Sequence, residues 1–418
     1  MSIGILDLND ANLQLWHQDT TVQSPGYALF QGTEYQFGSP ARAAARLQPR
    51  DINTRYWWQL STEALQPALG PARHNGDLAH AHLRQLHQDA KSPSEVLLAV
   101  SGSMQHEQLA LLLGIVQQCP FDAVGLVNRS VALGTLYGRS ERLFHLEIQL
   151  HQAVISELTK QDHQIELQRT ISLPGCGLLQ LQERLVELIA AAFVRQTRFD
   201  PRRKADSEQQ LYDALPAALH TLQNAPETNL EVNGYQARIS ANELQSAGKR
   251  LFDSARDTMG MLRPNDQIIA DPLAALLPGL TSLSERMHVL QADDIYRALQ
   301  SHQAQLIQRE QALSFVTTLP CLDQDIIASP DKASERSVAQ PTHVLCQHTA
   351  RPLIEAGTKL AAGCDLYRSS EGWQLRDSST PTIVNGTTYH SGQILACGDA
   401  INTGTNDTDV ALLIEVVD

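Results

Sequence analysis

The sequence predicts a mixed α/β body followed by a small all-β unit. Apolar runs of strand length alternate with longer helical segments through most of the chain. A polar, proline-containing stretch at 329–342 has no hydrophobic period and is typical of a linker. Short alternating segments separated by Gly, Ser, Asn and Asp follow it, as in an antiparallel sandwich. We therefore expect a body over 1–328 and a β-sandwich over 343–418.

The first half of the body, about 1–138, begins with strands and turns. A short helix is expected from Ser39, where proline occupies the first helical position. A second helix is expected from Asp77 and a buried strand over 95–102. A further helix then leads to a strand that ends at Asn128. Strand, helix and strand in this order predict a parallel α/β unit.

The second half, about 139–328, repeats this theme. Asn233-Gly234 between two alternating arms predicts a hairpin. The remaining expected elements are three neighbouring strands, two apolar helices, one long amphipathic helix, and a last strand and helix. They lie at 143–150, 153–158, 163–173, 178–196, 207–222, 241–262, 267–280 and 287–309.

The composition restricts the partners and the compartment. The formal net charge of −14 disfavours nucleic acid and anionic membranes as partners. There is no apolar run of about 18 residues and no signal-peptide pattern, so we expect no membrane association. The six cysteines are scattered singly, as in a protein with reduced thiols. These observations predict a cytoplasmic protein whose partners are other proteins, with oligomeric state left open.

Four stretches of the body resemble the ATPase domain of DnaK-type heat-shock chaperones, in the actin and sugar-kinase superfamily. "GILDLNDANLQLW" lies where that family has its first phosphate loop, and "LFHLEIQL" lies where it has its second. "YQFGSPARAAARLQPRDIN" and "VLLAVSGSMQHEQLALLLGIVQQCPFDAVGLVNRSVAL" resemble two further family segments. The resemblance covers about 1–312 and implies a two-lobed actin-like fold.

The resemblance also identifies the positions of the family's nucleotide site. Asp7 matches a metal-facing aspartate, whereas Asn9 and Asp10 replace Gly and Thr of the first loop. In the second loop His145 replaces an aspartate and Glu147 begins the segment that replaces the glycines. The other replaced positions are Ile148, Gln149, Arg129, Trp57, Ala270, Asp271 and 296–301.

These replacements predict that the nucleotide site has been lost. Glycine loops let backbone N–H groups close on phosphates, and bulky side chains fill that space. The hypothesis is therefore a non-catalytic interaction or regulatory protein of bacterial type, a pseudo-ATPase without cofactor. The competing hypothesis is a chaperone-like ATPase in which Asp7, Asn9, Asp10 and Glu147 rebuild a magnesium site and bind Mg·ATP.

The tail resembles the second half of a forkhead-associated domain. "EGWQLRDSSTPTIVNGTTYHSGQILACGDAINTG" has the spacing of Trp, Leu, Asn-Gly and Gly-Asp found in that family. The family's Gly-Arg pair and Ser-x-x-His segment have no clear copy upstream. Two hypotheses remain for this domain: a sandwich that binds protein surfaces, and a phosphopeptide-binding adaptor. The candidate binding residues are Arg368, Ser369, Ser370 and Asn385.

Three other features have a structural interpretation beside a functional one. His80, His82 and His87 suggest a metal site, but surface histidines are the favoured interpretation. Ser103 and His106 suggest a nucleophile and its base, but Ser103 is the better candidate for a helix cap. Two tryptophans, Trp57 and Trp58, are expected in the core, with an exposed anchor for a partner as the alternative.

Overall fold

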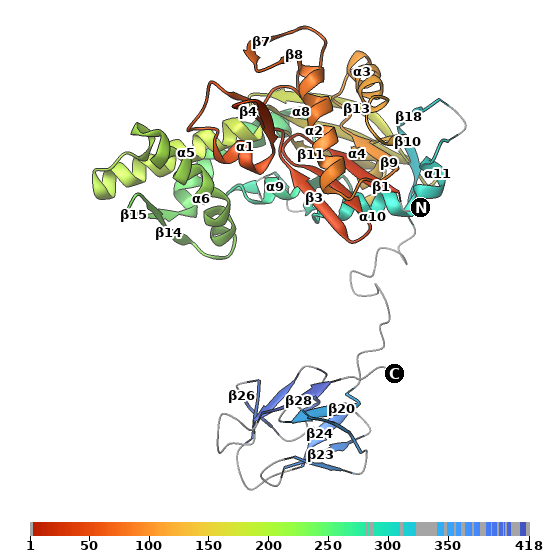
Figure 1. The fold of residues 1–418 in the computed structure, drawn as a ribbon, viewed down its shortest axis with the longest axis vertical. Helices are drawn as coiled ribbons and strands as arrows, with labels where there is room; N and C mark the ends of the chain where they lie inside the picture. The colour runs from red at the N-terminus through yellow and green to blue at the C-terminus, as the bar shows by residue number, and fades with distance from the viewer. Residues whose placement is uncertain are drawn as a thin grey trace. The chain divides into compact units, whose positions relative to one another are not determined.

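The computed structural model divides into two compact units, Met1–Asp323 and Gln324–Asp418 (Figure 1). We call them unit 1 and unit 2. Most of the expected linker at 329–342 lies outside the described residues. The residues described are 3–280, 283–284, 287–309, 312–322, 341–346, 349–354, 357–360, 364–369, 372–376, 382–385, 387–390, 393–395, 397, 399–402 and 410–414.

Unit 1 contains two six-stranded mixed sheets. The order of the first sheet is β18-β10-β9-β1-β2-β3. Its strands are β1 (Gly4–Leu8), β2 (Leu13–His17), β3 (Thr20–Ser24), β9 (Glu95–Val100), β10 (Asp122–Asn128) and β18 (Phe315–Val316). The order of the second sheet is β17-β16-β11-β12-β13-β19. Its strands are β11 (Arg142–Ile148), β12 (Gln152–Gln161), β13 (Gln164–Pro174), β16 (Gln267–Ala270), β17 (Met287–Val289) and β19 (Thr318–Pro320).

The two sheets repeat one arrangement. In each, three consecutive strands form an antiparallel meander, β1-β2-β3 and β11-β12-β13. Parallel strands then add beside the first strand of the meander, namely β9 and β10 beside β1, and β16 and β17 beside β11. The turn between β1 and β2 and the turn between β11 and β12 are therefore equivalent positions.

One helix lies between the sheets. All residues of α4 (Arg129–Tyr137) except the last are buried, and the helix contacts β9 and β10 of one sheet and β11, β12 and β13 of the other. Helix α10 (Asp294–Ser301) packs beside it and reaches β1. The other side of the first sheet packs on α2 (Asn75–Asp89) and α3 (His106–Val116), which contribute leucines to the same core.

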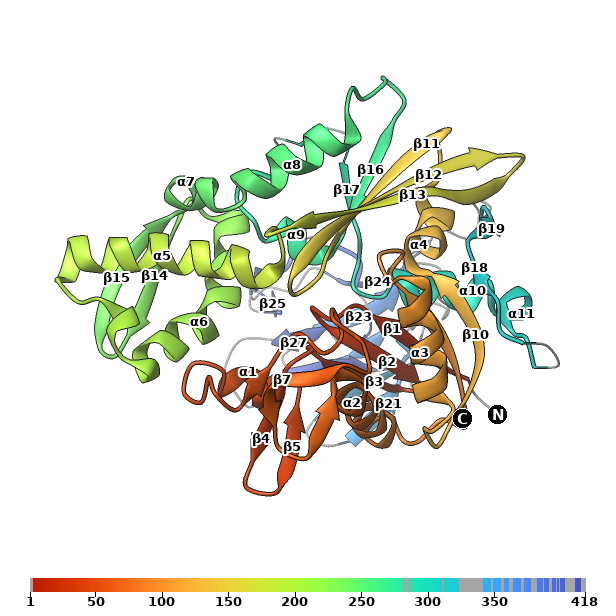
Figure 2. The same ribbon diagram turned by 90° about the horizontal axis from the view of Figure 1, so that it is seen from above.

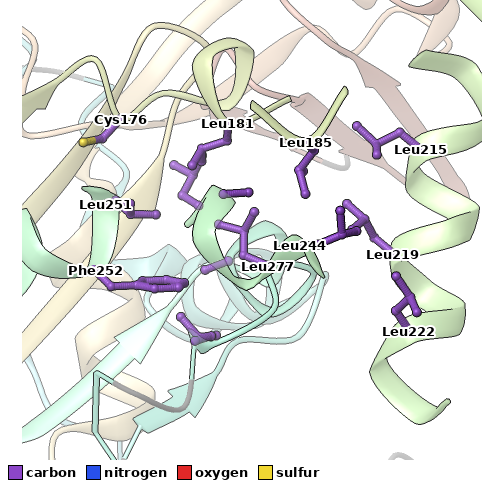
Figure 3. Close-up of a cluster of buried hydrophobic side chains, with 14 of the residues drawn as sticks. Cys176, Leu181, Leu185, Leu215, Leu219, Leu222, Leu244, Leu251, Phe252 and Leu277 are labelled. Atoms are coloured by element: carbon purple, nitrogen blue, oxygen red, sulfur yellow. The ribbon is translucent and has the colours of Figure 1, made fainter. Parts of the chain in front are cut away.

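The outer side of the second sheet shares one core with five helices of the second half. These are α5 (Leu178–Thr197), α6 (Ala205–Asn224), α7 (Ala241–Leu244), α8 (Lys249–Met259) and α9 (Pro272–Ala275). Figure 3 shows one cluster in which leucines of α5 lie between those of α6 on one side and Leu251 and Phe252 of α8 on the other. Figure 2 shows α5, α6 and the hairpin β14 (Glu227–Val232) and β15 (Tyr235–Ser240) together at one end of the unit.

The remaining elements of unit 1 are short. They are α1 (Ser39–Ala43), α11 (Gln303–Leu306), and the small sheets of β4 (Ala28–Gln31), β5 (Glu34–Phe37) and β6 (Ile52–Asn53), and of β7 (Ala64–Leu69) and β8 (Ala72–His74). None of the described helices is long and apolar enough to cross a bilayer.

The local predictions have mixed outcomes. The Asn233-Gly234 hairpin is confirmed, with both residues at positive φ and Val232 paired with Tyr235. The single long helix expected over 241–262 is wrong, because the chain turns at Gln245–Ala247 and a separate helix starts after Gly248. Ser103 is not a helix cap, since α3 begins at His106 and is capped by Gln105.

The strands described in unit 2 pair antiparallel. One sheet has the order β21-β20-β28-β27-β25-β26 and the other β22-β23-β24. Val344, Ile401 and Leu413 of the first sheet share a core with Leu366 and Trp373 of the second. The strands are β20 (His343–Cys346), β21 (Thr349–Pro352), β22 (Thr358–Lys359), β23 (Asp365–Arg368), β24 (Trp373–Leu375), β25 (Ile383–Val384), β26 (Thr387–Thr388), β27 (Ala400–Asn402) and β28 (Val410–Ile414).

Candidate functional site

Strand alternation directs the polar side chains of both central strands toward α4. In β1, Leu6 and Leu8 belong to the core shared with α2 and α3, so Asp7 lies on the opposite face. In β11, Phe144, Leu146 and Ile148 belong to the core of the outer helices, so His145 and Glu147 lie on the opposite face. The two sheets therefore direct these polar residues into the space between them.

Arg129 enters this space from α4. Strand β10 ends at Asn128, whose Oδ1 accepts a hydrogen bond from the N–H of Val131 and caps the helix. Arg129 is thus the first residue of a helix held between two sheets, and it is only 6% exposed. Its Nε lies 2.9 Å from Oδ1 and 3.1 Å from Oδ2 of Asp7.

Two further carboxylates face the same guanidinium. Nη1 of Arg129 lies 2.9 Å from Oδ1 of Asp271, just after β16, and 4.0 Å from Oε2 of Glu147. Nε2 of His145 lies 3.4 Å from the same Asp271 oxygen. We call Asp7, Arg129, His145, Glu147 and Asp271 the Arg129 cluster. Every carboxylate and the imidazole of the cluster is at most 1% exposed.

The two equivalent turns bond directly to one another. Nδ2 of Asn9, in the β1–β2 turn, donates to the carbonyl of Ile148 at 3.1 Å and to Oδ2 of Asp271 at 3.3 Å. Oδ1 of Asp10 accepts the N–H of Leu150, in the β11–β12 turn, at 2.8 Å. The side chains of Asn9 and Asp10 therefore connect the two sheets.

Helix α5 also holds the second turn. The N–H groups of Leu178 and Leu179 donate to the carbonyls of Gln149 and Leu150 at 2.8 and 3.0 Å. These N-terminal N–H groups of α5 are thus satisfied by the protein's own turn.

Glu147 accepts hydrogen bonds from Ser101 Oγ at 3.1 Å and from Gln149 Nε2 at 2.8 Å.

Burial and charge set the ionisation of the acids. Burial raises the pKa of Asp7 to about 6 although Arg129 opposes it. Burial likewise raises the pKa of Asp10 to about 7, against the hydrogen bond from Leu150. Burial alone would raise the pKa of Asp271, but the charges of Arg129 and His145 and their hydrogen bonds outweigh burial and hold this pKa at about 2. Burial disfavours the charged form of Arg129, but Asp271, Asp7 and Glu147 raise its pKa.

These residues do not fit a magnesium-bound nucleotide. The charge that a metal would supply between Asp7 and the second sheet is supplied by the guanidinium of Arg129. No group of three or more His, Cys, Asp or Glu in the described part of the chain could hold a metal ion. The expectation that the Ile148 side chain fills the space of the phosphates is wrong, because Ile148 packs in the core of the outer helices, whereas the Asn9 and Asp10 side chains do bond across the two turns.

Small pockets flank the cluster. One, of about 200 Å³, is lined by Asp7, Arg129 and Asp271 together with Leu133 and Leu290. Another, of about 210 Å³, is lined by Asp10, Ser103, Gln149 and the two tryptophans Trp57 and Trp58. Sites for drug-sized ligands measure roughly 300–1,000 Å³. Each pocket is therefore smaller than the usual range for such a ligand.

Two of the three histidines expected at the surface are buried. His82 is fully buried; its Nδ1 is 2.7 Å from Tyr56 Oη and its Nε2 is 2.7 Å from Ser24 Oγ. His87 is also buried, with Nε2 2.9 Å from the Pro93 carbonyl. The expectation of surface positions is wrong for both, because their position on α2 places them beside core leucines and local polar groups satisfy their rings.

The two adjacent tryptophans have different environments. Trp57 is 5% exposed, and its Nε1 donates to His82 at 3.2 Å. Trp58 is 38% exposed and stacks on His151 with ring centroids 5.1 Å apart. The core expectation therefore holds for Trp57 only.

In unit 2 the candidate binding residues lie on two sheets. Arg368 ends β23 and is exposed, and Ser369 closes a turn by bonding to Gly372 through both its N–H and its Oγ at 2.8 Å. Asn385 follows β25 at positive φ, where its side chain donates to Asp399 at 2.7 Å and accepts from the Ala400 N–H at 2.9 Å. Ser370 lies outside the described residues.

Comparison with protein-family models finds no match for this sequence, and comparison with curated proteins finds no similar chain.

Proposed function

We propose that this chain is a non-catalytic protein-interaction or regulatory protein, built on a degenerate DnaK-like, actin-like body. The repeated sheet order of unit 1 supports the two-lobed assignment. The equivalent β1–β2 and β11–β12 turns, which lie at the expected phosphate-loop positions, support it further.

A single observation carries the loss of the nucleotide site. Arg129 bonds Asp7 of the first sheet and Asp271 of the second at 2.9 Å each. A buried guanidinium between two carboxylates makes strong charge-assisted bonds in a fixed geometry. Displacing it with a metal would leave a buried charge without partners, which is costly. The arginine thus takes over the structural role of the cation without any turnover.

Calorimetric titration of the whole chain with Mg·ATP tests the loss of the site. The proposal expects no saturable heat, and phosphate release no faster in the wild type than in Asp7→Asn. Saturable binding that Asp7→Asn abolishes, together with phosphate release, would establish the ATPase alternative instead.

The interaction role needs its own experiment. Affinity purification of the whole chain from its own cells, with and without added ATP, is the suitable assay. The proposal expects a specific set of partners that nucleotide does not release. Partners that dissociate on addition of ATP would indicate a chaperone cycle and contradict the proposal.

A further inference from the structure

A third pocket lies away from the Arg129 cluster, between α1 and the helices α5 and α6. Figures 1 and 2 both show α1 beside α5 and α6. The pocket measures about 210 Å³ and is lined by residues from the first and second halves of unit 1. Below it, Tyr27 and Leu29 pack with Leu150 in a small buried cluster.

The floor of this pocket presents a hydroxyl group with no partner. Tyr27 is 5% exposed and lines the pocket, yet its Oη has no hydrogen bond to any described residue. Burial raises the pKa of Tyr27 to about 12, so the group stays protonated and is available to donate. Tyr212, which also lines the pocket, has a buried hydroxyl without a hydrogen-bond partner among the described residues, and such a group costs free energy unless something in the pocket accepts its proton.

The walls of the pocket carry opposite charges. Arg42, from α1, lines one side and has no ion pair with any described residue. Asp213, from α6, also lines the pocket and receives an amide hydrogen bond from Gln209 at 2.9 Å. A guanidinium binds a carboxylate strongly, and a carboxylate does the same for an ammonium group.

The other two charged groups of the lining already have partners. Arg46 pairs with Glu183, and its guanidinium lies 3.9 Å from the ring centroid of Tyr212. The backbone N–H of Arg46 donates to Oε1 of Gln209 at 2.9 Å, and Nε2 of Gln209 lies 3.3 Å from the Arg42 carbonyl. Arg42 and Asp213, both exposed, are thus the two charged groups of the described lining that have no ion pair and can reach a ligand.

We propose that this pocket binds a small zwitterion of the α-amino-acid class. The carboxylate of the ligand accepts from Arg42 and the Tyr27 hydroxyl, and its ammonium group faces Asp213. The volume is below the usual range for drug-sized ligands and suits a small metabolite. Asp213 and Glu183 repel the second carboxylate of a dicarboxylate, and Arg42 and Arg46 repel the second ammonium group of a diamine. The proposal does not depend on the loss of the nucleotide site.

Titration calorimetry of the whole chain tests this proposal. The probes are the standard L-α-amino acids, with succinate and putrescine as the single-sign comparisons. The expected result is saturable binding of one or a few amino acids, and none of succinate or putrescine. Tyr27→Phe and Arg42→Gln are each expected to weaken that binding by about tenfold or more.

Two control variants separate binding from folding. Tyr235→Phe and Arg184→Gln make the same chemical changes outside the pocket and are expected to leave binding unchanged. Thermal melts of all four variants establish that each is folded. Failure of every amino acid to bind, tighter binding of succinate, or unchanged binding in both pocket variants would overturn the proposal.

Discussion

The guanidinium Nε of Arg129 lies 2.9 and 3.1 Å from the two carboxylate oxygens of Asp7, 122 residues earlier in the chain. This contact joins the helix between the sheets to the first strand. Through Asp271 the same side chain also reaches the second sheet. One arginine therefore links the helix between the sheets to both sheets.

Removing this arginine is expected to destabilise unit 1 strongly. Arg129→Met leaves Asp7 and Asp271 buried without a cation, and such a loss costs about 3–5 kcal/mol. Denaturant unfolding followed by tryptophan fluorescence measures the change. Arg184→Met, on the exposed face of α5, is the control and is expected to change stability by less than about 0.5 kcal/mol. Equal midpoints for the two variants would contradict the role given to Arg129.

Asp10 is expected to make unit 1 less stable as the pH rises. Its pKa is about 7 in the folded chain and near 3.8 in the unfolded chain, so between these values the folded state holds more protons. Stability therefore falls with rising pH, by up to about 1.4 kcal/mol per pH unit from this group.

Asp10→Asn tests this dependence, because the amide oxygen still accepts the Leu150 N–H. The stability of the variant relative to the wild type is expected to increase between pH 4 and pH 7. Unfolding measured across this range shows the trend. A constant difference between the two proteins would mean that Asp10 does not titrate as described.

His82 is expected to act in the opposite direction. Burial lowers its pKa to about 3, below the ordinary 6.5, so between these values the unfolded state holds more protons. Stability from this group is present above pH 6.5 and is lost as the pH falls toward 3. His82→Gln is expected to lower stability at pH 8 but to reduce its decline in acid. An acid limb as steep as that of the wild type would refute this assignment.

Gly177 is expected to tolerate no side chain. A Cβ there would lie 2.3 Å from the carbonyl carbon of His151 and 2.4 Å from the N of Gln152, both backbone atoms. Gly177→Ala must therefore displace the β11–β12 turn or α5, and we expect a loss of at least about 2 kcal/mol.

Gly114→Ala, in α3, is the matched control. No atom lies within 4 Å of its added Cβ, and alanine favours the helix by about 1 kcal/mol. Thermal melts compare the two variants. A Gly177→Ala protein as stable as Gly114→Ala would show that α5 does not pack on the turn as described.

The sequence predicted the mixed α/β class, most strands and the Asn233-Gly234 hairpin, since these follow from local periodicity and turn chemistry. It also selected Asp7, Asn9, Asp10, His145 and Glu147, which the structure brings together. It missed that Arg129 and Asp271 complete the network. The sequence identifies each only as a replacement, because a contact between residues 142 positions apart leaves no periodic signal.

The burial and hydrogen-bond partners of individual polar side chains also could not be predicted from the local sequence. His82 looks like a surface residue in its sequence context, but Tyr56 and Ser24 come from other elements to satisfy it. Similarly, Ser103 has the composition of a cap, whereas Gln105 and Gln108 form the capping box of α3. A signal for Arg129 does exist in principle, namely a cation at the carboxyl end of a buried strand next to an aspartate-bearing strand.

A crystal structure of the whole chain grown with Mg²⁺ and a non-hydrolysable ATP analogue tests the central claim most directly. The account predicts electron density for the Arg129 guanidinium between Asp7 and Asp271, with no nucleotide or metal between the two sheets. Density for a nucleotide and its metal in contact with Asp7 and the β11–β12 turn, with Arg129 displaced, would contradict it.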